Sequence, residues 1–130
     1  QFKDAAGTVQ KLFNPLTTNT ITSRGEAAGL QGFLSFDLTL TGVKQGVASV
    51  TANGSGSATY QGVSAAVQIS SLVVPKTPGS YPSSGTISVS SNGITVTVTF
   101  NGTRYATGTY TYRNQSFTFT IDLQTGEVTK

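Results

Sequence analysis

Few residues of this chain carry the chemistry that enzymes use most often. The sequence contains no His and no Cys, so it cannot supply the usual nucleophile–base pairs or the imidazole and thiolate ligands of metal sites. Its acids are few and well separated: Asp4, Glu26, Asp37, Asp122 and Glu127. A two-carboxylate hydrolase needs two such groups across a cleft, whereas Asp37 and Asp122 are expected to be solvated on outward-facing strand positions. We therefore expect a protein that is not an enzyme, with no metal ion and no cofactor.

The densest group of candidate ligand-binding residues is a set of three tyrosines flanked by two arginines: Arg104, Tyr105, Tyr110, Tyr112 and Arg113. Aromatic rings beside arginine can stack on sugars or on bases. In the competing interpretation Tyr110 and Tyr112 belong to the sheet, because a two-residue turn at Asn114-Gln115 would pair them with Phe119 and Phe117. The sequence favours this second interpretation, and the absence of Trp further weakens the carbohydrate-binding one.

Three asparagines match the acceptor pattern for N-glycosylation, Asn-x-Ser/Thr: Asn53, Asn101 and Asn114. All three lie at predicted exposed turns. Asparagine is also preferred in tight hairpin turns, so turn chemistry alone explains the pattern in a chain this rich in Asn, Ser and Thr. They are candidates for modification only in a cell that glycosylates secreted proteins.

Alternation of apolar and polar residues predicts the elements that position these side chains. From Ser84 to Lys130 the pattern has the two-residue period of half-buried strands, interrupted by Asn-containing turns. A two-residue turn at Asn92-Gly93 would place Val89 opposite Val96. The alternation loses its phase after the next turn, which a bulge between Ala106 and Thr109 would repair. We expect an antiparallel meander with one dry face.

In the first half of the chain residues 17–32 are expected to be irregular, and alternation predicts four strands: 34–40, 47–52, 56–60 and 63–74. A three-residue loop at 53–55 would join the second and third of these strands. Residues 75–83 contain three prolines, which suits a crossover between two halves of the chain. We therefore expect residues 1–130 to form a single all-β domain of about 7–9 strands, as an antiparallel β-sandwich or, as second choice, a flattened β-barrel.

The first sixteen residues show a different period. Apolar residues recur at the spacing of one helix face: Phe2, Ala5, Ala6, Val9, Leu12, Phe13 and Leu16. Asn14-Pro15 would end such a helix, because the residue before proline is disfavoured in the α region. The pattern predicts a short N-terminal helix over residues 1–16, which either packs on the sheet or is the tail of a longer helix in a membrane-anchored or filament-forming precursor.

The threonines of the predicted strands also have two interpretations. Thr95, Thr97 and Thr99 share one face, and a regular face of hydroxyl and methyl groups could order water or bind a crystal surface. Threonine is also a polar residue with high strand propensity. The sequence favours this simpler explanation.

The composition limits the classes of function. Only 10% of the residues are charged, and the net charge of +3 comes from scattered residues rather than a basic block, so nucleic-acid binding is not expected. We expect a non-catalytic structural or adhesion domain that is secreted or displayed at the cell surface, such as a filament, pilus-like or surface-layer subunit or head domain. Its partners would be other protein subunits or a cell-surface partner, including a glycan, and it would reach a membrane only through a segment outside this chain. The alternative is a carbohydrate- or small-ligand-binding β-module.

Overall fold

The computed structural model describes residues 1–29 and 31–130 as a sheet of eleven strands: β1 (Phe2–Asp4), β2 (Val9–Gln10), β3 (Thr18–Ala28), β4 (Gly32–Thr41), β5 (Ser49–Tyr60), β6 (Val63–Pro75), β7 (Ser84–Ser91), β8 (Ile94–Thr99), β9 (Tyr105–Tyr112), β10 (Gln115–Asp122) and β11 (Val128–Thr129). No helix occurs among these residues, and so none that could cross a membrane.

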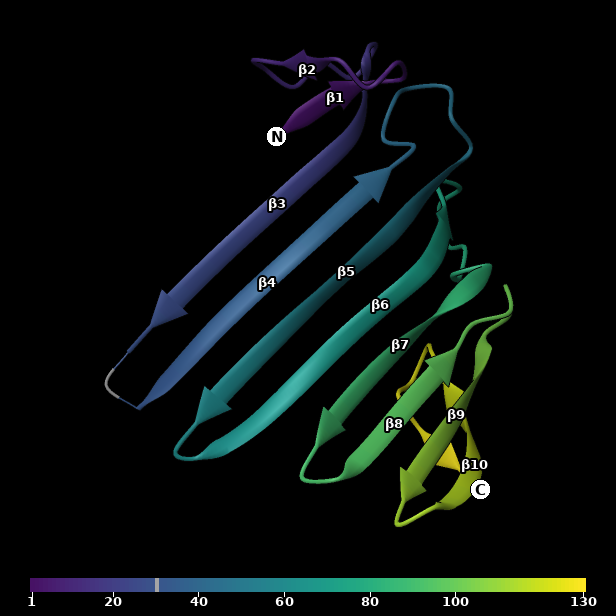
Figure 1. The fold of residues 1–130 in the computed structure, drawn as a ribbon. Coiled ribbons are helices and arrows are strands. Elements are labelled where there is room, and N and C mark those ends of the chain that lie inside the picture. The colour runs from purple at the N-terminus through teal and green to yellow at the C-terminus, as the bar shows by residue number, and fades with distance from the viewer. Residues whose placement is uncertain (30) are drawn as a thin grey trace.

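The strands form one antiparallel sheet in the order β11-β10-β9-β8-β7-β6-β5-β4-β3-β1-β2. From β3 onward each strand pairs with the next along the chain, and Figure 1 shows the result as one twisted layer. This confirms the expected all-β antiparallel class. The expected sandwich and flattened barrel are both wrong, since the described strands make neither a second layer nor a closed sheet, and the strand number exceeds the expected range.

The proline-rich segment explains part of this difference. Residues 76–83 connect β6 to β7, which are neighbours in the sheet, and Val73 pairs with Ser84 directly beside the connection. The prolines keep the loop itself out of the ladder, as expected from their missing N–H groups. A loop that returns the chain to the adjacent position cannot carry it to a second layer, so this segment is not a crossover.

Cross-strand register sorts the side chains of β3–β10 into two faces. Val89 lies opposite Val96 and Ile87 opposite Val98, as the Asn92-Gly93 turn predicted. The rows continue across the sheet and define what we call the apolar face: Ile21, Leu34, Phe36, Leu38, Leu40, Ala52, Val67, Ile69, Ile87, Val89, Ile94, Val96, Val98, Tyr110, Tyr112, Phe117, Phe119 and Ile121. The opposite side, rich in Ser and Thr, is the hydroxyl face.

The apolar face has no second layer of described residues upon it. Ala52 and Ala106 are the only buried apolar side chains among the described residues, and Leu34, Phe36 and Val89 are 48%, 43% and 41% exposed. The expectation of one dry face is therefore wrong within a single chain. The side chains obtain what shielding they have from their neighbours in the same sheet.

The N-terminal residues form strands instead of the expected helix. β1 pairs with β2 and with β3, and the turn between β1 and β2 is closed by Asp4, whose Oδ1 accepts hydrogen bonds from the backbone N–H groups of Ala6 (3.0 Å) and Thr8 (2.8 Å). Gly7 takes a positive φ of 85° in this turn. Side-chain bonding of this kind competes with a helix, and a glycine with positive φ ends it, so local turn chemistry outweighs the apolar period.

Two further expectations fail for local reasons. Residues 18–28 form β3 rather than an irregular segment, and residues 53–55 continue β5 rather than turning the chain. The hairpin that the sequence placed at 53–55 occurs instead at Gln61-Gly62, both of which have positive φ. At residues 70–71 of β6 the register with β5 shifts.

The bulge expected beside Gly108 is absent, because the described residues of β9 pair with β8 and β10 without a register shift. The longer loop of residues 100–104 accounts for the phase. Gly108 instead makes room for an aromatic ring, since a Cβ atom there would overlap the ring of Phe119 on the neighbouring strand. Gly108, which suggested a bulge, instead leaves the space that the ring of Phe119 on the neighbouring strand occupies.

Candidate functional site

The five Tyr and Arg candidates lie at two separate places, on β9 and in the loop and turn that flank it. Tyr110 and Tyr112 belong to the apolar face, whereas Tyr105 points to the hydroxyl face. The guanidinium of Arg113 lies 5.1 Å from the centre of the Tyr112 ring, and that of Arg104 lies 5.5 Å from the centre of the Tyr105 ring. Seven residues of strand put these two pairs roughly 23 Å apart. The structure thus does not bring the five candidates into one binding site.

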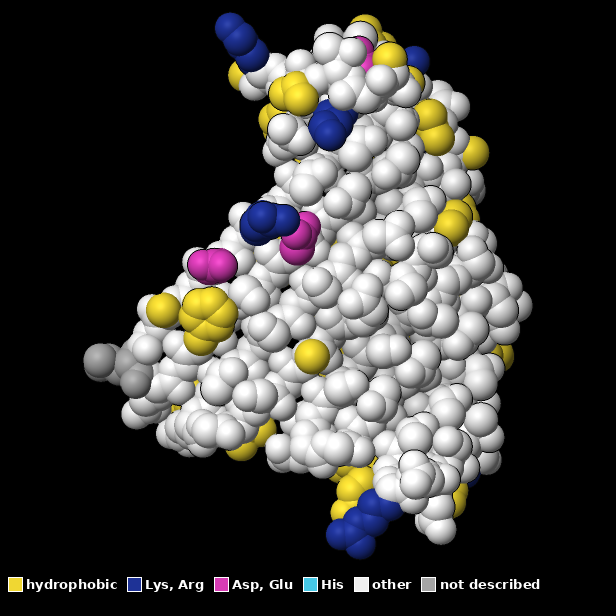
Figure 2. Space-filling model, in the orientation of Figure 1, with side chains coloured by type: hydrophobic (Ala, Val, Ile, Leu, Met, Phe, Trp, Pro, Cys, Tyr) yellow, Lys and Arg dark blue, Asp and Glu magenta, His cyan; other side chains and the backbone are white. Residues whose placement is uncertain are grey.

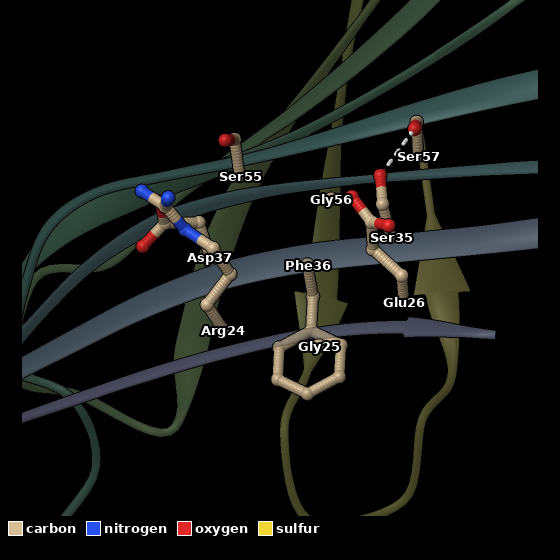
Figure 3. Close-up of a pocket in the computed structure, with 9 residues that line it drawn as sticks. All are labelled: Arg24, Gly25, Glu26, Ser35, Phe36, Asp37, Ser55, Gly56 and Ser57. Carbon is tan, nitrogen blue, oxygen red and sulfur yellow. Dashed lines mark hydrogen bonds and ion pairs between the residues drawn. The ribbon is translucent and has the colours of Figure 1, made fainter. Parts of the chain in front are cut away.

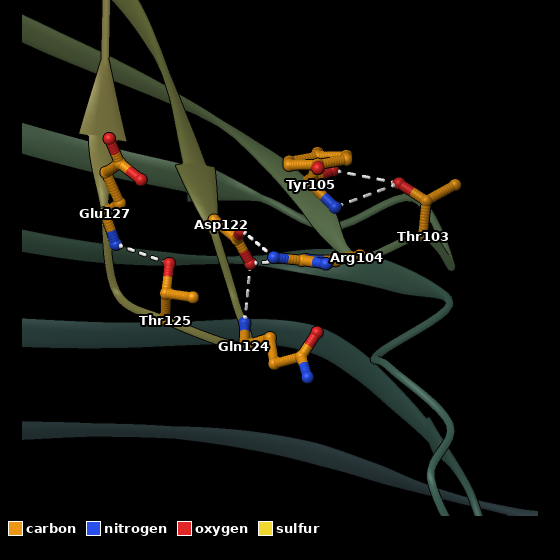
Figure 4. A network of polar contacts seen from close by, with 7 residues as sticks. All are labelled: Thr103, Arg104, Tyr105, Asp122, Gln124, Thr125 and Glu127. Atoms are coloured by element: carbon orange, nitrogen blue, oxygen red, sulfur yellow. Dashed lines mark hydrogen bonds and ion pairs between the residues drawn. The ribbon is translucent and has the colours of Figure 1, made fainter.

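Arg104 is part of a polar network at the end of the sheet (Figure 4). Its Nε donates to Oδ1 of Asp122 at 2.8 Å, and its Nη2 donates to Oδ2 of the same carboxylate. The backbone N–H of Gln124 also donates to Asp122 Oδ1, at 2.9 Å. The Asp122 side chain is only 12% exposed. The arrangement holds the loop that leads to β11 against β10.

Hydrogen bonding within this pair shifts both titrating groups. The bond from Arg104 holds the pKa of the Asp122 carboxyl far below its usual range, and this effect exceeds the opposing effect of burial. The same bond raises the pKa of Arg104 further above its ordinary value. Both groups therefore stay charged around neutral pH, which suits a structural ion pair better than proton transfer.

A second arginine–aspartate pair lies on the hydroxyl face of β3 and β4. Nε and Nη2 of Arg24 donate to Asp37 Oδ2 at 3.1 and 2.7 Å, and the two side chains are 77% and 42% exposed. The pair borders a shallow hollow of about 440 Å³, lined by Arg24, Gly25, Glu26, Ser35, Phe36, Asp37, Ser55, Gly56 and Ser57 (Figure 3). In the same view the ring of Phe36 extends across the strand to Gly25.

The two carboxylates considered for hydrolysis lie far apart. Asp37 is on β4 and Asp122 on β10, six strands away in the sheet. At the usual spacing of strands this separation is roughly 29 Å, well beyond the distance across which two carboxylates can act on one bond. Each carboxylate is bound by an arginine instead.

The three asparagines of the glycosylation pattern have different surroundings. Asn53 lies in the middle of β5, and its Oδ1 accepts a hydrogen bond from the backbone N–H of Ser71 at 2.7 Å, where the register shifts. Asn101 lies in the loop after β8, and its Oδ1 accepts from the N–H of Thr103 at 3.0 Å. Asn114 occupies the β9–β10 turn with a φ of 62°. Two of the three are thus at turns, as expected, and their modification stays a prediction.

That β9–β10 turn also corrects the predicted tyrosine pairing. Its two central residues are Arg113 and Asn114, one position earlier than expected. Tyr110 therefore lies opposite Phe117, with ring centres 6.3 Å apart, and Tyr112 lies opposite Gln115. A shift of one position in the turn moves the pairing by two residues and keeps every ring on its predicted face.

The hydroxyl face is arranged as predicted for the threonines of β8. Thr97 pairs with Ser88 and Thr109, and Thr95 with Ser90 and Thr111. The hydroxyl oxygens of Ser88 and Thr97 are 2.9 Å apart, so these groups bind one another across strands. Figure 2 shows this side of the sheet with few hydrophobic or charged side chains. Mutual hydrogen bonding gives the hydroxyls a structural role.

The apolar face is the candidate site that sequence reasoning missed. All charged residues of β3–β10 lie on the other face, at Arg24, Glu26, Asp37 and Asp122, so this side of the described strands carries no charge. Its rows span eight strands, from β3 to β10. The available signal was the succession of hairpins, because strands joined in this way usually lie side by side in one sheet. Comparisons of the chain with models of protein families, with curated proteins and with solved structures found no match.

Proposed function

We propose that the protein is a non-catalytic structural subunit of an extracellular or cell-surface assembly, in which a second copy covers the apolar face of its sheet. The observation that carries the proposal is the amount of surface that one chain leaves open. The chain has a mass of 13.4 kDa and exposes 8465 Å². A folded monomer of that mass is expected to expose about 6,500 Å², so about 2,000 Å² remain to be covered.

The size of the apolar face fits a stable interface. Eight strands at the usual spacing, with the apolar rows along them, make a patch of roughly 35 Å by 25 Å, or about 900 Å². Stable protein interfaces bury about 800 Å² on each partner. Apolar patches of this size are larger than those of most monomeric soluble proteins, and such patches mark interaction sites.

The chemistry of the face favours a second copy. None of its described strand positions is charged, and the charged side chains beside it, Arg113 at Tyr112 and Lys130 at Phe117, lie at its β9–β11 corner. Its aliphatic rows suit packing of one sheet upon another about 10 Å away. A second copy supplies a face of the same size and chemistry. The association would produce the two-layered sandwich between chains that the sequence predicted within one chain. Low overall charge and the Ser- and Thr-rich outer side support an extracellular location.

The test is the association state of two lysine variants. Val89 lies centrally on the apolar face, and Ser90 is its neighbour on the hydroxyl face. Wild-type protein is expected to associate with rising concentration in sedimentation equilibrium. Val89→Lys should weaken this association at least tenfold, since a buried unpaired charge costs more than about 1.4 kcal/mol. Ser90→Lys should leave it unchanged. A wild-type chain that stays monomeric at high concentration overturns the proposal.

A further inference from the structure

The outer edge of β10 is covered for only part of its length. β11 pairs with Thr120 and Ile121, and the N–H of Asp122 donates to the carbonyl of Glu127 at 2.9 Å. Strand residues alternate between inward and outward hydrogen bonding, so Ser116 and Thr118 direct their N–H and C=O groups to the same side as Thr120. No described strand pairs with them there.

This open edge lacks the features that usually prevent strand pairing. Natural edges are protected by charged residues, by proline or by a bulge. Residues 115–121 contain none of these, and Phe117 is 56% exposed. A hollow of about 420 Å³ lies beside the strand, lined by Tyr110, Phe117, Thr118, Phe119, Val128 and Lys130. The edge therefore offers backbone donors and acceptors beside an apolar recess.

We propose that β10 of one copy pairs antiparallel with β10 of a second copy, about a two-fold axis at Phe117. Ser116 of each copy then exchanges two backbone hydrogen bonds with Thr118 of the other, giving four bonds in all. The two Phe117 residues form the central pair without hydrogen bonds, in which side chains approach most closely. An axis perpendicular to the sheet keeps both apolar faces on one side, so the dimer has a single continuous sheet.

The direction of β11 favours this arrangement over pairing with the β3 edge. In the two-fold dimer Gln115 of the opposite β10 lies opposite Phe119, one residue before the pairing of β11 begins at Thr120, so the short strands themselves do not overlap. Lys130, which lies beside Phe119, has to turn away from the edge. In an antiparallel β10–β3 pair, β1 of one copy and β11 of the other would occupy the same gap, because β1 already covers β3 from Thr18 to Ile21. A β3–β3 pair centred on Glu26 would place two like charges opposite each other.

Disulfide formation tests the axis directly, because the chain has no cysteine of its own. In Phe117→Cys the two introduced residues would have Cα atoms about 4.5 Å apart, within the range of a disulfide. The matched control is Thr118→Cys, whose two Cα atoms would lie roughly 8.5 Å apart, beyond that range. We expect mild oxidation to crosslink most of the first variant and little of the second. Equal crosslinking of the two, or none of either, overturns the proposal.

Proline substitutions test the hydrogen bonds. Thr118→Pro removes an outward N–H that the folded chain does not use, and Glu26→Pro does the same on the β3 edge. When each is combined with Phe117→Cys, the first should reduce crosslinking at least fivefold and the second should not change it. If Thr118→Pro leaves the crosslinking unchanged, the outward N–H groups of β10 do not hold the two copies together and the two-fold arrangement is wrong. This edge contact does not depend on the apolar face: Val89→Lys should leave the crosslink intact even if it abolishes face association.

Discussion

The two edges of the sheet differ in how they are protected. At the β3 edge the strand is covered by β1 over its first residues, and its open part carries Arg24 and Glu26. At the β10 edge the cover is β11, and the open part carries hydroxyls and phenylalanines. Charges at an edge discourage a further strand, and their absence permits one. The comparison indicates that the β3 edge resists pairing with a further strand, whereas the β10 edge is available for it.

The same two edges carry matching arginine–aspartate pairs with different exposure. Arg24–Asp37 lies in solvent beside the β3 edge, whereas Arg104–Asp122 is shielded at the β10 edge and also receives a backbone N–H. An exposed pair contributes little to stability, because water and salt screen it. A shielded pair with further hydrogen bonds holds its loop in place, so each edge has an ion pair but only one is expected to matter for folding.

The largest effect should come from Asp122→Asn, with Asp37→Asn as its matched control. The first leaves the Arg104 guanidinium without its charged partner and should lower Tm by several degrees, while the second should cost less than about 1 kcal/mol. Folding lowers the pKa of Asp122, so its contribution is present above the ordinary carboxyl pKa of about 4 and is lost as the pH falls below it. The stability difference between wild type and Asp122→Asn, measured by urea unfolding, should therefore narrow in acid. A difference that is equal at pH 7 and pH 3 would contradict this.

The next largest loss of stability should come from replacing a glycine that an aromatic ring packs against, and one such glycine lies near each edge. Gly108 lies on the inner strand β9 under the ring of Phe119, and Gly25 lies on the edge strand β3 under the ring of Phe36. Gly108→Ala should lower the free energy of unfolding by about 1–3 kcal/mol, because Gly108 is buried between two strands and the added methyl group would displace the Phe119 ring. Gly25→Ala should cost less than about 1 kcal/mol, because the 43% exposed Phe36 ring can turn into solvent. Equal losses of unfolding free energy for the two variants in chemical denaturation would contradict this difference.

The alternation of apolar and polar residues predicted which strands pair, but it did not predict whether a second layer covers the sheet. The pairing of Val89 with Val96 followed from the Asn-Gly turn, because both the turn type and the apolar parity are local properties. Whether a second layer covers Val89 depends on long-range connections. Many natural sheets hide an apolar face within one chain, and that generality suggested a sandwich here.

Local competition explains the errors in single elements. Phe2 and Val9 fit a helical period, but the side chain of Asp4 and the positive φ of Gly7 favour a turn between two strands. Asn53-Gly54 resembles a hairpin turn, yet Asn53 instead binds the N–H of Ser71 at a register shift in the middle of long strands. The uncovered apolar face was harder to predict than these elements, because the alternating pattern of residues is the same whether or not a second layer covers the face. The composition also does not distinguish a covered face from an uncovered one.

The smallest effect on stability, and the most direct test of the comparison, should come from removing the charges of the β3 edge. Arg24→Thr combined with Glu26→Thr makes its open part resemble that of β10 and should change the free energy of unfolding by no more than about 0.5 kcal/mol, since both residues are exposed. The threonines also raise strand propensity. We expect the double variant to form larger species in sedimentation velocity than wild type, because both edges of each copy can then pair. The control is the same double change with Thr118→Pro added, which should still pair through β3 but lose the β10 contact. If the double variant sediments like wild type, the charges of β3 are not what keeps that edge closed, and β1 alone must protect it.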